Sequence, residues 1–211
     1  MYICTAIKRH KNENSQKTYS MKLIYFHGFG SSGASGTVEI LRKLLPDDQI
    51  IAPDIPIDPV EALPYLKQLC AEEQPDIVIG TSMGGMYAQQ MRGFVRICIN
   101  PALNMSTMSG ALRTGEHKFF NGRKDGQKTF RITRDIIQHH NQMERQQWKD
   151  ITDWDREHCY GLFGIHDTVV NTYDLFHKHY PHATRFDGEH RLNEKVLRKV
   201  VIPLIEELRQ K

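Results

Sequence analysis

Short runs of consecutive apolar residues alternate along the chain with stretches in which apolar residues recur every three or four positions. Continuous apolar runs are typical of strands in a parallel sheet covered on both faces, whereas the wider spacing is typical of amphipathic helices. The alternation predicts an α/β protein with a mostly parallel sheet and helices on both faces. The expected strands are residues 22–27, 49–52, 76–81, 95–100, 160–165 and 184–186, and the expected helices are residues 35–45, 60–73, 83–92, 172–179 and 193–210.

Residues 103–158 interrupt this alternation. The part from 110 to 127 is rich in Gly, Lys and Arg, which indicates a loop. The part from 130 to 151 has apolar residues at roughly helical spacing, namely Ile132, Ile136, Ile137, Met143, Trp148 and Ile151. We expect this excursion to form a small, partly helical cap beside the strand ends. A surface insertion unrelated to any functional site is the alternative.

Length and composition are those of a soluble protein with one domain. The chain has 211 residues, of which 39% are hydrophobic, and we expect a single domain at 21–211 after a disordered, polar and basic tail at 1–20. No apolar run approaches the ~20 residues that span a bilayer, and a net charge of +3 is too small to argue for nucleic acid. The four cysteines show no CxxC spacing, so reduced thiols and a cytoplasmic location are expected.

The sequence Gly80-Thr81-Ser82-Met83-Gly84 follows a run of β-branched residues and precedes a helical pattern. A G-x-S-x-G turn between strand and helix is typical of a nucleophile elbow, in which the serine adopts strained dihedral angles between small neighbours. Gly80 and Gly84 lack the Cβ atoms that would collide in such a turn. Ser82 is therefore the candidate nucleophile. A solvated serine in an ordinary glycine-rich turn is the alternative.

A serine nucleophile requires a histidine base, and the histidine requires an acid that fixes its tautomer. In the chain order of an α/β-hydrolase, the acid follows the nucleophile and the histidine comes last. Asp167 follows the expected strand at 160–165, and His190 follows the next strand. Loops after parallel strands share one edge of a sheet, so Ser82, Asp167 and His190 are expected to converge.

Other titratable residues are weaker candidates for these roles. Two aspartates precede the strand at 160–165 and a third is too near His190 along the chain, so none fits the acid as well as Asp167: Asp153, Asp155 and Asp187. Three histidines cluster near a helix end, where a solvated terminus is a simpler interpretation than a metal site: His177, His179 and His182. No metal and no cofactor are expected.

The backbone around the elbow should also stabilise an oxyanion. The N–H of Met83 follows the nucleophile, and the loop after the first strand normally provides a second donor. We assign this donor to Phe29, with Gly28 permitting a close backbone approach. His27 is interpreted as a structural residue that supports this loop.

The same loop also matches a different motif. Gly28-Phe29-Gly30-Ser31-Ser32-Gly33 reads as G-x-G-x-x-G between a strand and a helix, and Asp54 ends the next strand about twenty residues later. A dinucleotide-binding fingerprint would leave the elbow, Asp167 and His190 as coincidences. The loop also continues through further small residues, which suggests a longer turn than a pyrophosphate requires. We therefore favour the hydrolase interpretation.

Several motifs together resemble the small bacterial YqiA-type esterases of the α/β-hydrolase superfamily. They are Tyr25-Phe26-His27-Gly28-Phe29 with Ser31-Ser32, Ala52-Pro53-Asp54-Ile55-Pro56, Gly80-Thr81-Ser82-Met83-Gly84-Gly85, Asn100-Pro101-Ala102, His166-Asp167-Thr168-Val169 and Glu189-His190. The resemblance covers residues 22–208. It implies carboxylesterase activity on short acyl esters, with Ser82 as nucleophile, Asp167 as acid and His190 as base. Departures include the polar, basic excursion and Glu189, where a small residue often precedes the histidine.

The sequence thus predicts a serine carboxylester hydrolase that acts through an acyl-enzyme on a small ester substrate. A thioesterase or acyltransferase would use the same acyl-enzyme, and a non-catalytic binding module of the same fold is a further alternative. Neither a nucleic acid nor a membrane is an expected partner, and the oligomeric state stays open.

Overall fold

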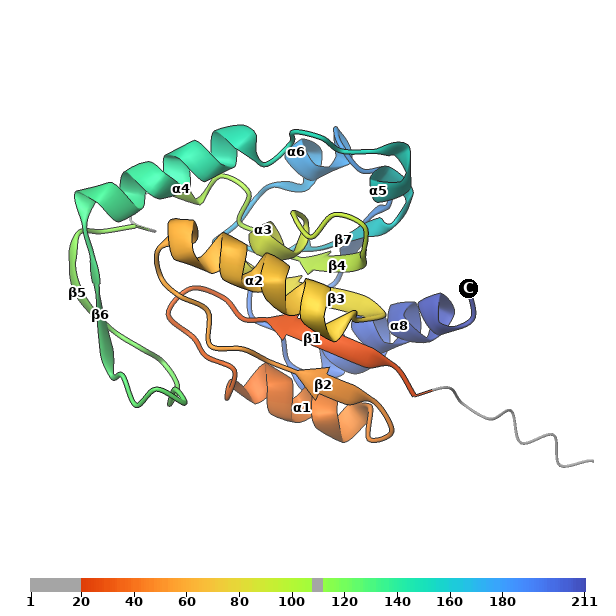
Figure 1. The fold of residues 1–211 in the computed structure, drawn as a ribbon. Coiled ribbons are helices and arrows are strands. Elements are labelled where there is room, and N and C mark those ends of the chain that lie inside the picture. The colour runs from red at the N-terminus through yellow and green to blue at the C-terminus, as the bar shows by residue number, and fades with distance from the viewer. Residues whose placement is uncertain (1–19, 108–111) are drawn as a thin grey trace, which may run out of the picture.

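The computed structural model describes residues 20–107 and 112–211, so residues 1–19 of the expected tail lie outside the described part. One sheet of six strands, all parallel, runs in the order β2–β1–β3–β4–β7–β8 (Figure 1). The predicted six-stranded sheet is confirmed. The strands are β1 Lys22–Phe26, β2 Gln49–Ile51, β3 Ile77–Thr81, β4 Val95–Ile99, β7 Cys159–Gly164 and β8 Ala183–Phe186.

Helices cover both faces of this sheet and create two separate hydrophobic cores. Along β1, Leu23 and Tyr25 point into one core, whereas Ile24 and Phe26 point into the other, as the two-residue period of a strand requires. The first core lies under α1 Gly36–Leu44 and the C-terminal elements α7 Glu194–Val196, η2 Leu197–Val201 and α8 Ile202–Arg209. The second lies under α2 Pro59–Glu73, α3 Met83–Ala88 and α6 Tyr173–His177.

Three expected helices differ from the observed ones, and one of them, predicted at 172–179, spans only Tyr173–His177. The helix after the elbow ends at Ala88, so it is shorter than the predicted 83–92. The predicted C-terminal helix at 193–210 is interrupted by the π-helical segment η2. Pro203 follows η2 at the start of α8, and its missing N–H removes a regular helical hydrogen bond there, which favours an irregular turn.

The excursion contains a β-hairpin that the sequence analysis did not predict. Its strands β5 Gly115–Lys118 and β6 Thr129–Ile132 pair antiparallel, so the expected loop at 110–127 is wrong for its central part. Of the paired residues only Phe130 and Ile132 are buried, which left too little apolar pattern to indicate strands. The remaining elements are η1 Met105–Thr107, α4 Arg134–Gln146 and α5 Asp153–Glu157.

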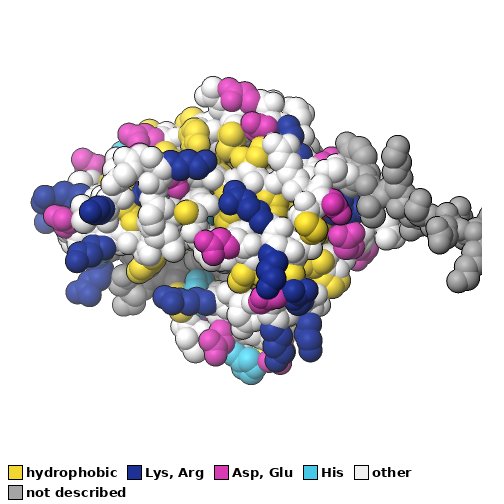
Figure 2. Space-filling view, turned by 90° about the horizontal axis from the view of Figure 1, so that it is seen from below, with side chains coloured by type: hydrophobic (Ala, Val, Ile, Leu, Met, Phe, Trp, Pro, Cys, Tyr) yellow, Lys and Arg dark blue, Asp and Glu magenta, His cyan; other side chains and the backbone are white. Residues whose placement is uncertain are grey.

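The hairpin projects beside the sheet and carries many positive charges. It lies at the left in Figure 1, where it joins α4 above α2. In the space-filling view, Lys and Arg side chains gather at the same end of the molecule (Figure 2). The exposed cations of the hairpin are Lys118, Lys124, Lys128 and Arg131.

The tip of the hairpin is fastened to the loop that follows β1. The Phe120 N–H donates to the Gly30 carbonyl at 2.8 Å, and the Ser32 hydroxyl donates to the Gly122 carbonyl at 2.7 Å. The Ser31 hydroxyl bonds Asn121 at 3.0 Å. These contacts place part of the excursion beside the carboxyl ends of the strands. No helix in the described residues is long and apolar enough to cross a bilayer.

Candidate active site

The elbow at the end of β3 holds Ser82 in a strained conformation. Ser82 has φ 57° and ψ −119°, a region that residues with a side chain rarely adopt. A Cβ on Gly80 would overlap the Gly84 carbonyl, and a Cβ on Gly84 would overlap the Phe26 carbonyl, so both positions require glycine. The Ser82 N–H is bound to the Ile99 carbonyl at 2.9 Å, which ties the turn to β4. The strain therefore persists because the surrounding backbone fixes it.

Two loops at the same sheet edge bring an imidazole and a carboxylate to this serine. His190 Nε2 lies 3.1 Å from Ser82 Oγ, and His190 Nδ1 lies 2.8 Å from Asp167 Oδ2. The other carboxylate oxygen of Asp167 accepts the N–H groups of Val169 and Val170, each at 2.8 Å. The Asp167 side chain is 3% exposed and that of His190 is 19% exposed. The structure thus brings together the three side chains that sequence reasoning expected to converge.

The two contacts of His190 indicate which of its ring nitrogens carries the proton. A carboxylate that accepts a hydrogen bond from Nδ1 favours the tautomer in which Nδ1 carries the proton. Nε2 then presents a lone pair to the Ser82 hydroxyl, which is the arrangement required of a general base.

His27 orients the loop after β1. Its Nδ1 is 2.8 Å from the Gly28 carbonyl, and its Nε2 accepts the Ile55 N–H at 3.1 Å. Burial lowers the pKa of His27 to about 4, so the ring is neutral and donates from Nδ1. Because C=O and N–H point in opposite directions across a trans peptide, fixing the Gly28 carbonyl also fixes the direction of the Phe29 N–H. A Cβ on Gly28 would make only an ordinary 3.5 Å contact with Ser82 Cβ, so packing within the protein does not require glycine at this position.

Asp54, which completed the dinucleotide fingerprint, has a different role. One of its carboxylate oxygens accepts the Gly33 N–H at 2.8 Å, and the other accepts the Lys124 N–H at 2.7 Å. Asp54 therefore joins the glycine-rich loop to the hairpin. The hairpin tip lies on the loop where a pyrophosphate would have to bind.

Two of the three alternative acids are paired with other side chains. Asp155 forms a buried ion pair with Arg96 at 3.2 Å, and Asp187 contacts His166 at 3.0 Å. The clustered histidines each stack on a different ring, with the pairs His177–Tyr173, His179–Trp148 and His182–Tyr160. Within the described residues, no three His, Cys, Asp or Glu side chains are placed to hold a metal ion.

Asn100 is a structural part of this site whose role the sequence analysis did not assign. It lies at the end of β4 with φ 44° and is 1% exposed. Its amide nitrogen donates to the Glu189 and His190 carbonyls at 3.0 and 3.2 Å, and its oxygen accepts the Gly164 N–H at 2.8 Å. Asn100 thus joins the end of β7 to the loop that carries His190. The motif Asn100-Pro101-Ala102 marked the position without revealing these partners.

A cavity of about 680 Å³ opens beside the Ser82 hydroxyl. The elbow, the loop after β1, the N-terminus of α1, the hairpin tip and the His190 loop all contribute to its wall. Several apolar side chains line it, and Phe120, which is 71% exposed, is the most accessible of them. This volume is large enough for a small organic substrate.

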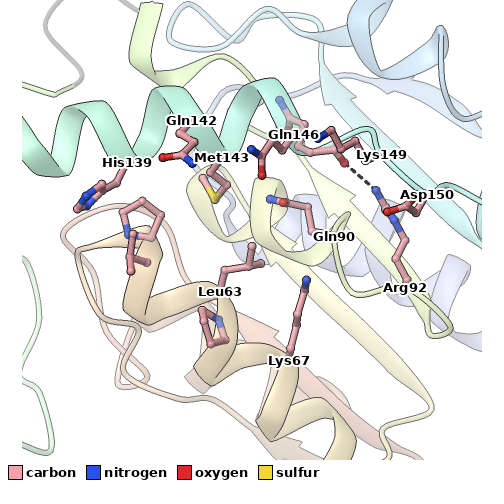
Figure 3. Close-up of a pocket in the computed structure, with 14 residues that line it drawn as sticks. Leu63, Lys67, Gln90, Arg92, His139, Gln142, Met143, Gln146, Lys149 and Asp150 are labelled. Carbon is pink, nitrogen blue, oxygen red and sulfur yellow. Dashed lines mark hydrogen bonds between the residues drawn. The ribbon is translucent and has the colours of Figure 1, made fainter.

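A second cavity, of about 440 Å³, lies between α2 and α4 (Figure 3). Lys67 extends from α2 toward Gln90, and Gln146 lies on the opposite wall (Figure 3). Arg92 closes one end through a 2.7 Å bond to the Gln147 carbonyl. Among the residues that the structure describes, no Ser, Thr or Cys lines this cavity. The first cavity, with its serine and histidine, is therefore the better candidate for an active site.

The sheet order, the elbow and the loops that meet it define an α/β-hydrolase fold. Est1E from Butyrivibrio proteoclasticus aligns with a TM-score of 0.66 at 13% identity, covering 94% of this chain and 92% of that one. Alpha/beta hydrolase domain-containing protein 10 from mouse aligns with a TM-score of 0.62 at 14% identity, covering 91% and 92%. The esterase domain of a Rhodothermus marinus protein aligns with a TM-score of 0.61 at 16% identity, covering 92% and 89%.

A narrower assignment comes from the sequence itself. The model of UPF0227, described as an uncharacterised protein family, matches residues 22–193. The chain belongs to this family, and its resemblance to YqiA-type esterases is confirmed.

Proposed function

We propose that the protein is a serine carboxylester hydrolase that acts through an acyl-enzyme intermediate. The observation that carries this proposal is the continuous chain from Ser82 through His190 to Asp167, with distances of 3.1 and 2.8 Å, on a strained elbow. A serine hydroxyl, an imidazole and a carboxylate in this order form an activated nucleophile.

In the proposed reaction, Ser82 Oγ attacks the ester carbonyl carbon while His190 Nε2 takes the hydroxyl proton. The tetrahedral intermediate then expels the alcohol, which receives that proton from His190. Water repeats the sequence on the acyl-enzyme: His190 takes a proton from water, and the acid is released as Ser82 regains its hydrogen. Asp167 holds the His190 tautomer and stabilises the imidazolium throughout.

The negative charge on the tetrahedral oxygen would be stabilised by the N–H groups of Met83 and Phe29. Met83 is the first residue of α3, so its N–H belongs to the free end of a helix, and His27 orients the peptide that contains the Phe29 N–H. Neither N–H donates to an acceptor within the described part of the chain. Each donor of this kind typically contributes about 10²–10³-fold to turnover.

Ester hydrolysis is the reaction that the comparisons favour. The Rhodothermus marinus neighbour is described as an esterase domain, and the family resembles YqiA-type esterases. The apolar wall of the 680 Å³ cavity suits a short acyl or alcohol group.

The experiment is hydrolysis of p-nitrophenyl acetate by the purified protein. Wild type should release p-nitrophenol in a protein-dependent manner, and Ser82→Ala should lower kcat by about 10⁴-fold or more because the nucleophile is removed. Ser20→Ala, at an exposed serine bonded to the Asp47 carbonyl, serves as the matched control. Equal turnover by wild type and by a folded Ser82→Ala protein would refute the proposal.

A further inference from the structure

The permanently charged side chain that lines the active-site cavity is positive. Among the described residues, its lining contains no Asp, Glu or Lys, and Arg191 is the one permanently charged side chain there. Arg191 is exposed and makes no ion pair within the described residues. The exposed cations of the hairpin, whose tip also lines the cavity, add to the positive potential at this end of the molecule (Figure 2).

The N-terminus of α1 opens into the same cavity. Ser35, Gly36, Thr37 and Ile40 all line it, and α1 has nine residues. The first helical hydrogen bonds run from Val38 and Glu39 to the Ser35 carbonyl, so the Gly36 and Thr37 N–H groups have no acceptor in the described chain. Unpaired N–H groups and the positive end of the helix dipole together favour a negatively charged group at such a terminus.

The Ser35 hydroxyl is a second, independent observation at this terminus. Ser35 is 8% exposed, and its Oγ has no hydrogen-bond partner among the described residues. It occupies the N-cap position, where a serine normally accepts a backbone N–H, yet it makes no capping bond. A buried hydroxyl without a partner is costly, and no hydrogen bond restrains its rotation toward a ligand.

We propose that the cavity binds esters that carry a carboxylate away from the scissile bond, and that the carboxylate binds at the N-terminus of α1, facing Arg191. The proposal rests on the proposed ester hydrolysis and names its substrate class. One helix terminus and one arginine match a single negative charge. The apolar side chains that line the cavity would hold the carbon chain between this carboxylate and the scissile bond.

The test compares two esters that differ only at the remote end, p-nitrophenyl hexanoate and the p-nitrophenyl monoester of adipic acid. The measured quantity is the ratio of their kcat/KM values, each corrected for uncatalysed hydrolysis, so a general loss of activity cancels. Wild type should prefer the adipate monoester by about tenfold, the effect of one charge-assisted contact at a helix terminus. No preference in an active enzyme would overturn the proposal and leave ester hydrolysis intact.

Gly36 provides a charge-reversal variant with a matched control. A Cβ on Gly36 would meet nothing within 4 Å, so Gly36→Asp and Gly36→Asn both fit, and they differ only in charge. Gly36→Asp should lower the ratio by about tenfold or more relative to Gly36→Asn, because its carboxylate would occupy the subsite and repel the carboxylate of the substrate. Arg191→Gln should lower the ratio, whereas Arg42→Gln, at the other end of α1, should not. Equal ratios in both Gly36 variants would contradict the assignment.

A binding experiment decides the matter even if neither ester is hydrolysed. Monomethyl adipate and methyl hexanoate are titrated into Ser82→Ala protein by calorimetry. Tighter binding of the adipate, lost when Gly36→Asp is added and kept with Gly36→Asn, supports the subsite independently of catalysis. Equal binding of the two ligands overturns the proposed subsite.

Discussion

Two histidine–aspartate pairs in this molecule have nearly the same nitrogen–oxygen distance but different surroundings. His190 lies 2.8 Å from Asp167 at the edge of the sheet, and His139 lies 2.9 Å from Asp58 where α4 meets the start of α2. The first pair has Ser82 Oγ at 3.1 Å from its second ring nitrogen. Within the described residues, the second ring nitrogen of His139 makes no hydrogen bond, and His139 lines a cavity that has no hydroxyl side chain in its wall.

The difference shows that a histidine–aspartate pair does not by itself make a nucleophilic site. What distinguishes the first pair is the backbone around it. The strained turn presents Ser82 to His190, and Asn100 fixes the loop that carries the imidazole. Asp58, by contrast, accepts the Val60 N–H as the N-cap of α2, so its position is explained by helix capping.

The largest expected effect comes from making the same substitution in both pairs. Asp167→Asn should lower kcat for p-nitrophenyl acetate by about 10⁴-fold, because an amide no longer enforces the tautomer that His190 needs. Asp58→Asn should change kcat less than about twofold, since asparagine also caps a helix well and the pair is outside the active-site cavity. A comparable loss in both variants would mean that the two pairs do not differ in function.

A smaller effect is expected when the support of the His190 loop is removed. Asn100→Gly keeps the positive φ but deletes the side chain that bridges Gly164 and His190, so kcat should fall by about 10–100-fold through misplacement of the imidazole. Asp150 also has a positive φ, 57°, and lines the second cavity, so Asp150→Gly is the matched control. Steady-state kinetics should therefore show a lower kcat in folded Asn100→Gly than in folded Asp150→Gly. Unchanged kcat in Asn100→Gly would rule out the positioning role.

The smallest effect concerns stability near the second pair. His140 is fully buried beside the Ile57 carbonyl, but neither ring nitrogen makes a hydrogen bond within the described chain, and burial lowers its pKa to about 4. Because the unfolded histidine has a pKa near 6.5, stability should be lost as pH falls from about 6.5 to 4. His140→Leu should raise the free energy of unfolding by about 1–3 kcal/mol at neutral pH and weaken this pH dependence.

Urea unfolding from pH 7 to pH 4 measures both effects. His27, whose pKa is also lowered to about 4, keeps part of the pH dependence in the His140→Leu variant. A His140→Leu variant that is less stable than wild type at every pH would show that the ring of His140 makes a stabilising interaction, which would contradict the prediction.

The sequence predicted the parts of the fold that depend on local pattern. Continuous apolar runs indicated all six strands of the main sheet, and the Gly80–Gly84 motif indicated the turn because only small residues fit there. The positions of Asp167 and His190 followed from strand order, since loops after parallel strands share an edge. Their catalytic roles stay predictions.

The features that were missed depend on contacts between distant segments. Asn100 bonds partners 64 to 90 residues away along the chain, and no local pattern encodes such a bridge. The hairpin is stabilised partly by its tip, which docks on the loop after β1, so its own residues carry little strand signal. Asp54 was assigned to a possible nucleotide motif because its two real partners, Gly33 and Lys124, become neighbours only after folding.

Covalent labelling tests the central claim most directly, because it detects an activated serine without any assumption about substrate. Native protein is treated with a fluorophosphonate probe and the modified peptide is identified by mass spectrometry. We predict stoichiometric modification of Ser82 and a sharp loss of labelling in His190→Ala. Failure of the folded wild-type protein to react, or reaction at a different serine, would contradict the account.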